Sequence, residues 1–448
     1  MPEDKRTLKL ETITESLNSG AMLKAKLILN GLHPSEIARL LESSPPRERR
    51  IIWEMFNHKN DGEVLLEVGE EVRSSLIESM DDESLLAATK GLDIDDLADL
   101  LVELPEKVIS EALNGMDYQY RNRLEGVLNF PEDTAGGLMN TDTITIRPDV
   151  TLDVVLRYLR LRGEMPDNTD NIIVVDRYNR YIGTLSVTDL LCKEPEQLVS
   201  ETMIEDDIVI EAKAPAKEVI SIFEDRDLVS APVVDDKNLL LGRITIDDVV
   251  DEIREESEST ILHMAGLTDE EDVFAPVIPS ARRRGIWLGI NLITALMAAW
   301  VISLFQNTIE QVVALAVLMP IVASMGGIAG MQTLTLVIRG IALGNIRKKN
   351  SKSLLIKELM VGVLNSLLWS IIIGTIASYW FENYLIGFVI AFAMISNLVF
   401  AAVSGVALPI ILKRIGIDPA LAGGVLLTTI TDVLGFFSFL GLGSLILL

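Results

Sequence analysis

The chain contains 448 residues, is 49 % hydrophobic and carries a formal net charge of −26. This length allows two or three domains, and such acidity combined with so much apolar content does not suit one uniform globule. The acidity also argues against nucleic-acid binding, which requires the opposite charge.

Charge divides the chain near Val277. Eleven basic and five acidic residues follow it, a net charge of +6, which leaves −32 for the preceding part. An acidic soluble part therefore precedes a basic membrane part. Such an acidic surface can gather cations, although acidity for solubility alone is an alternative. Cys192 is the only cysteine, which excludes a disulfide within one chain and suits a reducing cytosol.

Residues 1–130 are predicted to form an all-α N domain. Segment 33–44, HPSEIARLLESS, places Ile37 and Leu40 on one helical face before two prolines. Segment 93–106, DIDDLADLLVELPE, repeats that pattern. Recurrence of this kind is typical of a superhelix built from helical repeats.

The next region contains a duplication with mixed α/β character. NIIVVDRYNRYIGTLSVTDLL (171–191) and SAPVVDDKNLLLGRITIDDVV (230–250) align at an offset of 59, with a Val-Val-Asp triplet, a glycine and an aspartate at matching positions. Each copy is predicted as strand, turn, strand and helix start, with a helical stretch before it. The pattern resembles a tandem pair of CBS domains, which we place at 131–200 and 201–247.

CBS domains often bind adenine nucleotides, so the resemblance implies a possible ATP site. The usual ribose contact is an aspartate after threonine or serine in the strand-to-helix turn. Thr188-Asp189 and Asp247-Asp248 occupy these places. Helix N-capping is the alternative role for an aspartate there.

Residues 248–275 are predicted to connect the soluble part to the membrane part, beginning with one long helix over 248–264. It is either a solvated linker or a rod that couples the two parts. Its acidic residues include Asp248, Asp251, Glu255, Glu256 and Glu258.

Residues 276–448 are predicted to form an α-helical membrane domain. Each of five apolar segments exceeds the roughly 20 residues that a bilayer requires. The predicted spans lie near 285–306, 311–341, 354–381, 385–412 and 419–447.

The flanking charges predict the orientation. With the N-terminus inside, the inner flanks hold all the flanking basic residues, whereas the outer loops hold Glu310 and Glu382, as the positive-inside rule requires. Five spans then place the C-terminus outside. The inner basic residues are Arg282, Arg283, Arg284, Arg347, Lys348, Lys349, Lys352, Lys413 and Arg414.

The last apolar segment contains one carboxylate, Asp432. A charge at the bilayer centre costs roughly 2.5–3.5 kcal/mol on insertion scales, and such residues are functional by default. Asp432 follows Pro419 by about 20 Å along a helix, and no lysine or arginine lies at comparable depth. It is therefore either protonated or exposed to water and cations. The neighbouring threonines add hydroxyls, although these often bond their own helix.

The second segment contains PIVASMGGIAGMQTLTLV (320–337), whose glycines either free carbonyls to line a cavity or simply pack helices closely.

One carboxylate per chain is poor ligation for a bare divalent ion. Two chains related by a two-fold axis would supply two, which suits hydrated Mg²⁺ because it keeps several of its waters. Further polar residues in the spans are Gln332, Asn365 and Asn397.

The whole chain resembles the MgtE-type magnesium channels, in domain order and in the stretches LHPSEIARLL, EDTAGGLM, GIDPAL and TDVLG. The resemblance implies a homodimer in the lipid bilayer of the bacterial inner membrane, with a central pore for Mg²⁺. Asp432 matches the family's pore carboxylate and Asp418 an acidic residue at the cytosolic mouth. The connecting helix matches a plug helix that closes the pore. Ile328 and Met331 stand where members commonly have asparagines, so Asp432 and backbone carbonyls are the better filter candidates.

Gating by cytosolic Mg²⁺ is the predicted regulation. We expect Mg²⁺ ions to bridge Asp93, Asp95 and Asp96 of the N domain with the connecting-helix acids and with Asp418, and their loss to open the pore by repulsion. The alternative function is an ion-coupled Mg²⁺ exchanger. An enzyme is not expected, since the sequence has no Walker loop, HExxH motif or Cys/His cluster.

Overall fold

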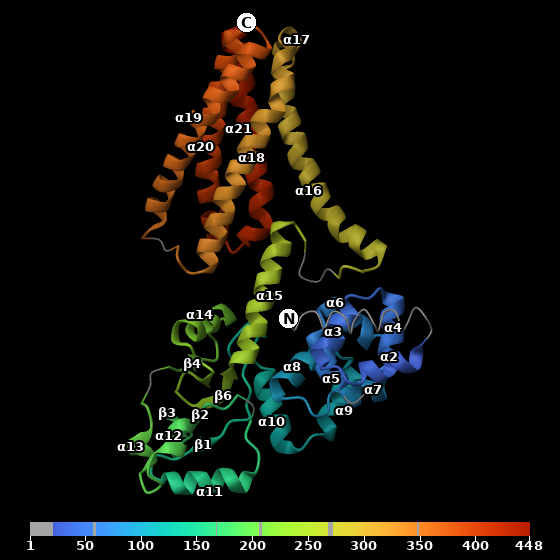
Figure 1. Ribbon diagram of the computed structural model, residues 1–448, viewed down its shortest axis with the longest axis vertical. Coiled ribbons are helices and arrows are strands. Elements are labelled where there is room, and N and C mark those ends of the chain that lie inside the picture. Colours follow the sequence, from blue (N-terminus) through green and yellow to red (C-terminus); the bar gives the residue numbers. More distant parts are fainter. Residues whose placement is uncertain (1–20, 57–59, 167, 206–207, 268–271, 347–348) are drawn as a thin grey trace. The chain divides into compact units, whose positions relative to one another are not determined.

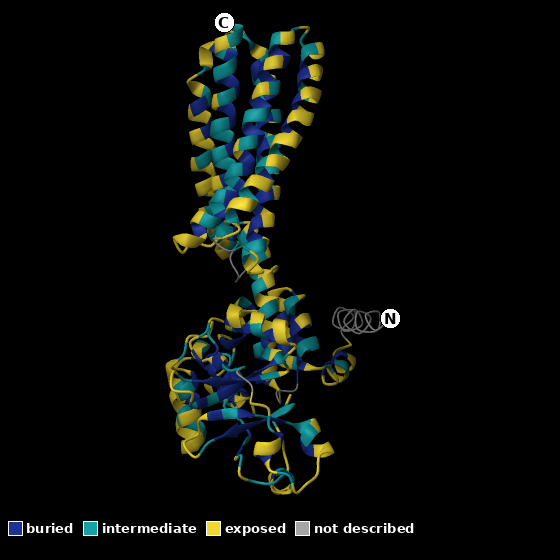
Figure 2. Ribbon diagram, turned by 90° about the vertical axis from the view of Figure 1, so that its left-hand side faces the viewer, coloured by how far each residue is buried: buried dark blue, intermediate teal, exposed yellow. Residues whose placement is uncertain are grey.

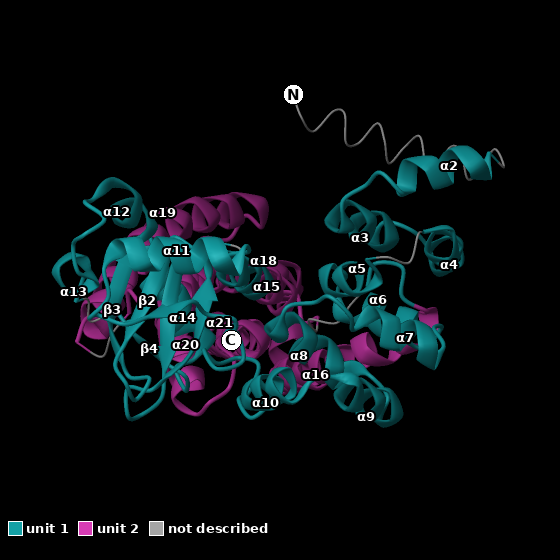
Figure 3. Ribbon diagram, turned by 90° about the horizontal axis from the view of Figure 1, so that it is seen from below, with its two compact units in different colours: residues 1–257, 270–275 teal, residues 258–269, 276–448 magenta. Residues whose placement is uncertain are grey.

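The computed structural model describes residues 21–448 except 57–59, 167, 206–207, 268–271 and 347–348 (Figure 1). The chain divides into two compact units (Figure 3). The first contains residues 1–257 and 270–275, and the second contains residues 258–269 and 276–448. Arg347 and Lys348, two of the predicted inner charges, lie outside the described residues.

The N domain of the first unit is all helical, as predicted. Prolines occupy the first positions of α3 and α4, where a missing N–H costs nothing. Asp81 and Asp117 cap α7 and α10 by accepting backbone N–H groups. The helices are α2 (Met22–Leu29), α3 (Pro34–Glu42), α4 (Pro46–Met55), α5 (Asp61–Glu67), α6 (Glu70–Ile77), α7 (Asp82–Ala88), α8 (Ile94–Glu103), α9 (Glu106–Gly115) and α10 (Tyr118–Val127).

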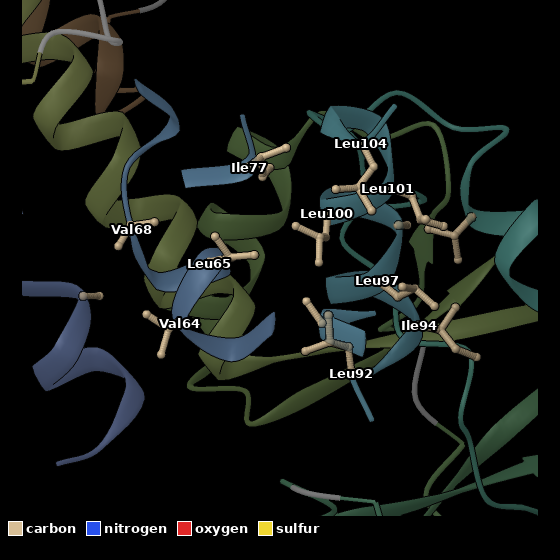
Figure 4. Packing of buried hydrophobic residues seen from close by; sticks show 14 of the residues in the cluster. Val64, Leu65, Val68, Ile77, Leu92, Ile94, Leu97, Leu100, Leu101 and Leu104 are labelled. Carbon is tan, nitrogen blue, oxygen red and sulfur yellow. The ribbon is translucent and has the colours of Figure 1, made fainter. Parts of the chain in front are cut away.

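Leucine and valine side chains of α5 and α8 form the centre of this domain (Figure 4). Val64, Leu65, Leu97 and Leu100 are each 0 % exposed. Truncating one such leucine to alanine typically costs about 2–5 kcal/mol of stability. This packing holds α8, which carries the N-domain acids, in a fixed position.

The duplicated region forms two three-stranded sheets with the same topology. In each, the first strand pairs parallel to the second and the second antiparallel to the third. The antiparallel ladder shifts register at Val174/Val175 in one sheet and at Val233/Val234 in the other. The two repeats therefore share even this irregularity. The strands are β1 (Thr145–Ile146), β2 (Asn171–Val175), β3 (Tyr181–Ser186), β4 (Ile210–Glu211), β5 (Ser230–Val234) and β6 (Leu240–Thr245).

The hairpin turns of the two repeats bind each other reciprocally. Asn179 and Asn238, each at φ 61°, occupy equivalent turn positions. The backbone N–H of Tyr181 donates to the Asn238 carbonyl, and that of Leu240 to the Asn179 carbonyl, both at 3.0 Å. The helices of this region are α11 (Leu152–Arg162), α12 (Val187–Cys192), α13 (Val199–Thr202) and α14 (Ala216–Arg226).

A single helix, α15 (Ile246–Met264), follows the second sheet. It begins two residues before the predicted start and ends at the predicted residue. The boundary between the two compact units falls within it, after Ser257. The segment after the helix returns to the first unit, where Asp272 accepts from Arg49 Nη2 at 2.8 Å. The two side chains are only 5 % and 4 % exposed.

The second unit contains five helices long and apolar enough to cross a membrane among the described residues. The predicted spans are confirmed within three residues, except that the first helix begins at Val277, directly after Pro276. Exposed residues cover much of the outer surface of this unit (Figure 2). The helices are α16 (Val277–Ser303), the short α17 (Gln306–Gln311), α18 (Val313–Ala342), α19 (Ser351–Trp380), α20 (Tyr384–Arg414) and α21 (Pro419–Leu447).

Candidate ion sites in the two units

Carboxylates from α8 and from the start of α15 form an acidic cluster in the first unit. Asp95 is 8 % exposed on α8. Asn140 joins it to the CBS region, because its Nδ2 donates to Asp95 Oδ1 and to Asp93 Oδ2, each at 3.3 Å. Loss of solvation and then the nearby charge of Asp248 raise the pKa of Asp95 to about 8. Asp95 and Asp248, which were predicted as site residues in separate segments of the chain, are therefore close enough to repel each other.

Asp248 belongs to the same cluster. Burial and the adjacent Asp247 raise the pKa of Asp248 to about 7, although Thr245 opposes the shift by donating to the Asp248 carboxylate. The Thr245 backbone N–H donates to Asp248 Oδ2 at 3.3 Å and the hydroxyl at 3.0 Å. The carboxylate therefore has both a local bonding role at the start of α15 and a long-range electrostatic one.

Two more α8 carboxylates extend the cluster. Burial and then Asp93 raise the pKa of Asp96 to about 6, while burial and then Glu132 raise the pKa of Asp99 to about 7. Asp99 was not predicted as a site residue, although its spacing of four from Asp95 places both on one helical face. Sequence periodicity could therefore have indicated it.

The other acids predicted on the connecting helix differ in their surroundings. Burial raises the pKa of Asp251, against the lowering effect of Arg254. Glu256 forms an ion pair with Lys217 of α14, so it is already neutralised. Glu255 belongs to the first unit and Glu258 to the second. The charges of Asp248, Asp251 and Glu255 each raise the pKa of an α8 carboxyl, namely Asp95, Asp96 and Asp99 respectively, so these three lie near the N-domain acids.

Oxygen ligands of this type suit a hard divalent cation. Within the part of the chain that the structure describes, however, no three histidine, cysteine, aspartate or glutamate side chains are grouped closely enough to hold a metal ion. A cation would therefore lower the repulsion within the cluster through a few carboxylates plus its own waters.

The strand-to-helix turn of the first CBS repeat presents Thr188 and Asp189. Ser186 caps α12 by accepting from the Thr188 N–H at 3.2 Å. Capping, the alternative considered for Asp189, is therefore performed by Ser186. Asp189 instead lies 3.5 Å from Lys193 in an ion pair whose side chains are partly exposed.

Asp432 lies on α21 within the second unit and is partly exposed. Among the described residues no salt bridge involves it, which agrees with the absence of a basic residue at its depth. The neighbouring threonines bond their own helix: Thr429 Oγ1 donates to the Val425 carbonyl at 2.7 Å, and Thr431 Oγ1 to the Leu427 carbonyl at 3.1 Å. These hydroxyls are thus used within the helix, whereas the Asp432 carboxylate is partly exposed.

Asp418 caps the start of α21 and contacts the last turn of α15. Its Oδ1 accepts from the Ala420 N–H at 2.9 Å, and its Oδ2 lies 2.7 Å from His263 Nδ1. His263, Asp418 and α21 all belong to the second unit. No local pattern in the sequence indicated His263, because the contact joins segments distant along the chain.

The other polar residues of the spans differ in position. Gln332 and Asn365 are exposed on the outside of the unit, as is Ile328 of the glycine-rich stretch. Asn397 is instead fully buried between helices. Glu358, one of the five acidic residues that follow Val277, is 5 % exposed and accepts from Lys357 Nζ at 2.7 Å and Thr333 Oγ1 at 3.3 Å.

Models of known protein families match successive parts of the chain. The family model of the MgtE divalent cation transporters matches residues 319–442, and that of the MgtE intracellular N domain matches residues 32–133. CBS domain models match residues 135–194 and 199–255. The chain belongs to the MgtE family. The resemblance seen in its sequence is thereby confirmed.

Relatives in this family match over nearly the full length. A magnesium transporter MgtE of Bacillus subtilis is 28 % identical over 96 % of this chain and 95 % of its own length. That of Thermus thermophilus is 29 % identical over 99 % of both. A crystal structure of the cytosolic domain of the Mg²⁺ channel MgtE in complex with ATP is 27 % identical, with a TM-score of 0.49, over 54 % of this chain and 99 % of that one.

Proposed function

We propose that this MgtE family member imports Mg²⁺ across the bacterial inner membrane as a homodimer, with its N-terminus in the cytosol and its C-terminus outside. The observation that carries the proposal is Asp432, a carboxylate within a spanning helix and without a basic partner among the described residues. Two such carboxylates in a dimer suit a hydrated Mg²⁺ ion. The relatives named as magnesium transporters support the choice of ion.

The proposal is tested by uptake into proteoliposomes. Asp432→Asn keeps the size of the side chain and removes its charge, so Mg²⁺ uptake should fall to the background of protein-free vesicles. Glu310→Gln makes the same change of charge on α17, where Glu310 accepts from Gln306 at 2.9 Å, and should leave uptake unchanged. Normal uptake by Asp432→Asn would refute the pore role.

An ion-coupled exchanger is the competing mechanism. Uptake driven only by the Mg²⁺ gradient supports a channel, whereas dependence on an imposed H⁺ or Na⁺ gradient supports exchange. In a channel, the direction of Mg²⁺ flux should also reverse when the magnesium gradient is reversed. The membrane potential of the cell, and not the protein itself, would then set the inward direction of transport.

We propose that cytosolic Mg²⁺ closes the pathway by binding at the acidic cluster of α8 and α15. Support comes from the mutual repulsion of Asp95 and Asp248, which a divalent cation would relieve. Mg²⁺ bound there would favour the arrangement in which α8 and the start of α15 are held together. A ligand shifts such an equilibrium only by its preference for one state.

The gate is tested by neutralising Asp95, Asp248 and Asp251 together. The triple variant should continue to carry Mg²⁺ at millimolar cytosolic Mg²⁺, where the parent protein closes. Closure at the same Mg²⁺ concentration as the parent would count against an electrostatic gate. Protease cleavage within α15 should also decrease as Mg²⁺ rises for the parent and not for the variant.

Nucleotide binding is the second ligand proposal. The CBS family models that match residues 135–194 and 199–255 support it, and Thr188 and Asp189 lie at the exposed first turn of α12. Titration calorimetry of the full chain in detergent should show ATP binding that Asp189→Ala or Asp248→Ala weakens. Absence of heat at millimolar ATP would end this proposal.

A further inference from the structure

Asn397 lies near the middle of α20 and is 0 % exposed. Its Nδ2 donates a hydrogen bond of 2.8 Å to the carbonyl of Val322 on α18. The amide orientation is well defined, because exchanging its nitrogen and oxygen would set two acceptors against each other. Asn397 therefore links α20 to the backbone of α18 in the interior of the membrane unit.

Two glycines from different helices make room for this amide. A Cβ atom on Gly326 of α18 would lie 2.2 Å from Asn397 Nδ2, and one on Gly435 of α21 would lie 2.8 Å from the same atom. Neither position could carry a side chain without displacing the amide. Gly435 is one helical turn from Asp432. The Asn397 amide thus joins the glycine-rich part of α18 to the turn of α21 that carries the carboxylate.

Stability alone does not explain an asparagine here. Its Oδ1 is buried and has no hydrogen-bond partner among the residues that the structure describes, and an unpaired buried acceptor is unfavourable. An interhelical hydrogen bond in a membrane contributes only modestly. An apolar residue of similar size would avoid the unpaired acceptor, so the asparagine is better explained by the geometry it imposes.

We propose that Asn397 is a positioning residue that fixes the spacing of α18 and α21 beside Asp432 and thereby sets the discrimination between divalent cations. This inference rests on the proposed transport function. Mg²⁺ holds its water shell strongly and requires regular geometry at short distances. Small changes in the room beside Asp432 should therefore alter passage of Mg²⁺ differently from that of a transition metal such as Co²⁺.

The first test measures initial uptake of Mg²⁺ and Co²⁺ into proteoliposomes that contain the full chain. Asn397→Ala removes the hydrogen bond and Gly435→Ala displaces the amide. Each should change the Mg²⁺ to Co²⁺ uptake ratio by about threefold or more, the factor expected for loss of one average membrane hydrogen bond. Ser366→Ala is the matched control. Ser366 is also 0 % exposed, but its hydroxyl bonds Val363 of its own helix at 2.8 Å, so the ratio should stay unchanged.

The second test measures the spacing itself and does not depend on transport. Spin labels at Ile328 of α18 and Leu426 of α21, both exposed, are introduced in a Cys192→Ser background. Dilution with unlabelled chains leaves only distances within one chain. Asn397→Ala should broaden or shift the distance distribution, and Ser366→Ala should not.

These measurements separate failure of the inference from failure of the proposed function. If the parent carries neither ion, the transport proposal fails and the label distances still decide the positioning role. If the parent carries Mg²⁺ but Asn397→Ala leaves both ratio and distances unchanged, the inference is overturned. Should Asn397→Ala not fold, Asn397→Ser carries the same tests, because its hydroxyl is too short to reach the Val322 carbonyl.

Discussion

The carboxylates of the first unit, here called the soluble unit, and those of the second, the membrane unit, are arranged in opposite ways. In the soluble unit, Asp96 lies within electrostatic reach of Asp95, Asp99 and Asp248, Asp95 also lies within reach of Asp248, and burial leaves each of the four with a raised pKa. In the membrane unit, carboxylates are few and single, and two of the described ones have a basic neighbour: Asp418 has His263 and Glu358 has Lys357. In the function that we propose, a cation relieves the repulsion within the acidic cluster, whereas Asp432 offers a single charge to the transported ion.

Removing a paired acid from the soluble unit should have the largest effect on stability. Asp272→Ala would leave the guanidinium of Arg49, 4 % exposed, without its carboxylate. Loss of one partner from a buried pair costs about 3–5 kcal/mol. Thermal unfolding of the full chain in detergent should show a clearly lower transition for this unit. Asp82→Ala breaks an exposed pair with Lys107 and should leave the transition in place.

Removing clustered acids should have the opposite sign. Asp95→Asn and Asp248→Asn together replace two repelling carboxylates by neutral amides, so the variant should be more stable than the parent in metal-free buffer at pH 8, by at least about 1 kcal/mol. Unfolding by denaturant, followed through the buried Trp53, would measure the difference. A destabilised variant would show that the hydrogen bonds from Asn140 and Thr245 outweigh the repulsion.

The same repulsion predicts a pH dependence. An acid whose pKa is raised in the folded state binds more protons there than when unfolded, so stability decreases as pH rises between the two pKa values. For this cluster the range extends from about pH 4 to about pH 8, which the raised pKa of Asp95 sets at its upper end. In metal-free buffer, the soluble unit should unfold at lower temperature at pH 8 than at pH 5.5. Millimolar Mg²⁺ should reduce the difference, and a melting temperature that rises with pH would contradict the assignment.

The smallest effect is expected at the hydroxyls beside Asp432. Thr429→Val removes a group that donates only within α21, so Mg²⁺ uptake and stability should both remain within experimental error. Surface-like effects of this size are usually below about 0.5 kcal/mol. A strong loss of uptake would mean that the hydroxyl, and not Asp432 alone, meets the ion.

Local patterns allowed much of this structure to be predicted from the sequence. The five spans followed from long apolar runs, and the two sheets from a duplication whose copies share their turns. The N-domain helices followed from apolar periodicity and prolines. Each of these signals lies within one segment, so a single sequence carries it.

Contacts between distant segments could not be predicted in this way. The pairing of Asp418 with His263, the bridge from Asn140 to Asp95 and the ion pair of Glu256 with Lys217 depend on tertiary packing. Asn397 gave an ambiguous signal, because a polar residue in a span can face a pathway or another helix. Its position between Gly326 and Gly435 became evident only from the packing of three helices.

The reciprocal turns of Asn179 and Asn238 have a consequence for the origin and assembly of the soluble unit. Each turn donates to the other through equivalent atoms, with Asn179 Nδ2 bonding Leu240 at 3.3 Å and Asn238 Nδ2 bonding Tyr181 at 3.0 Å. A contact in which the same surface meets itself is the pattern of a symmetric dimer. The pair is therefore built like two subunits joined into one chain, and a repeat expressed alone would retain a surface that is complementary to its own copy.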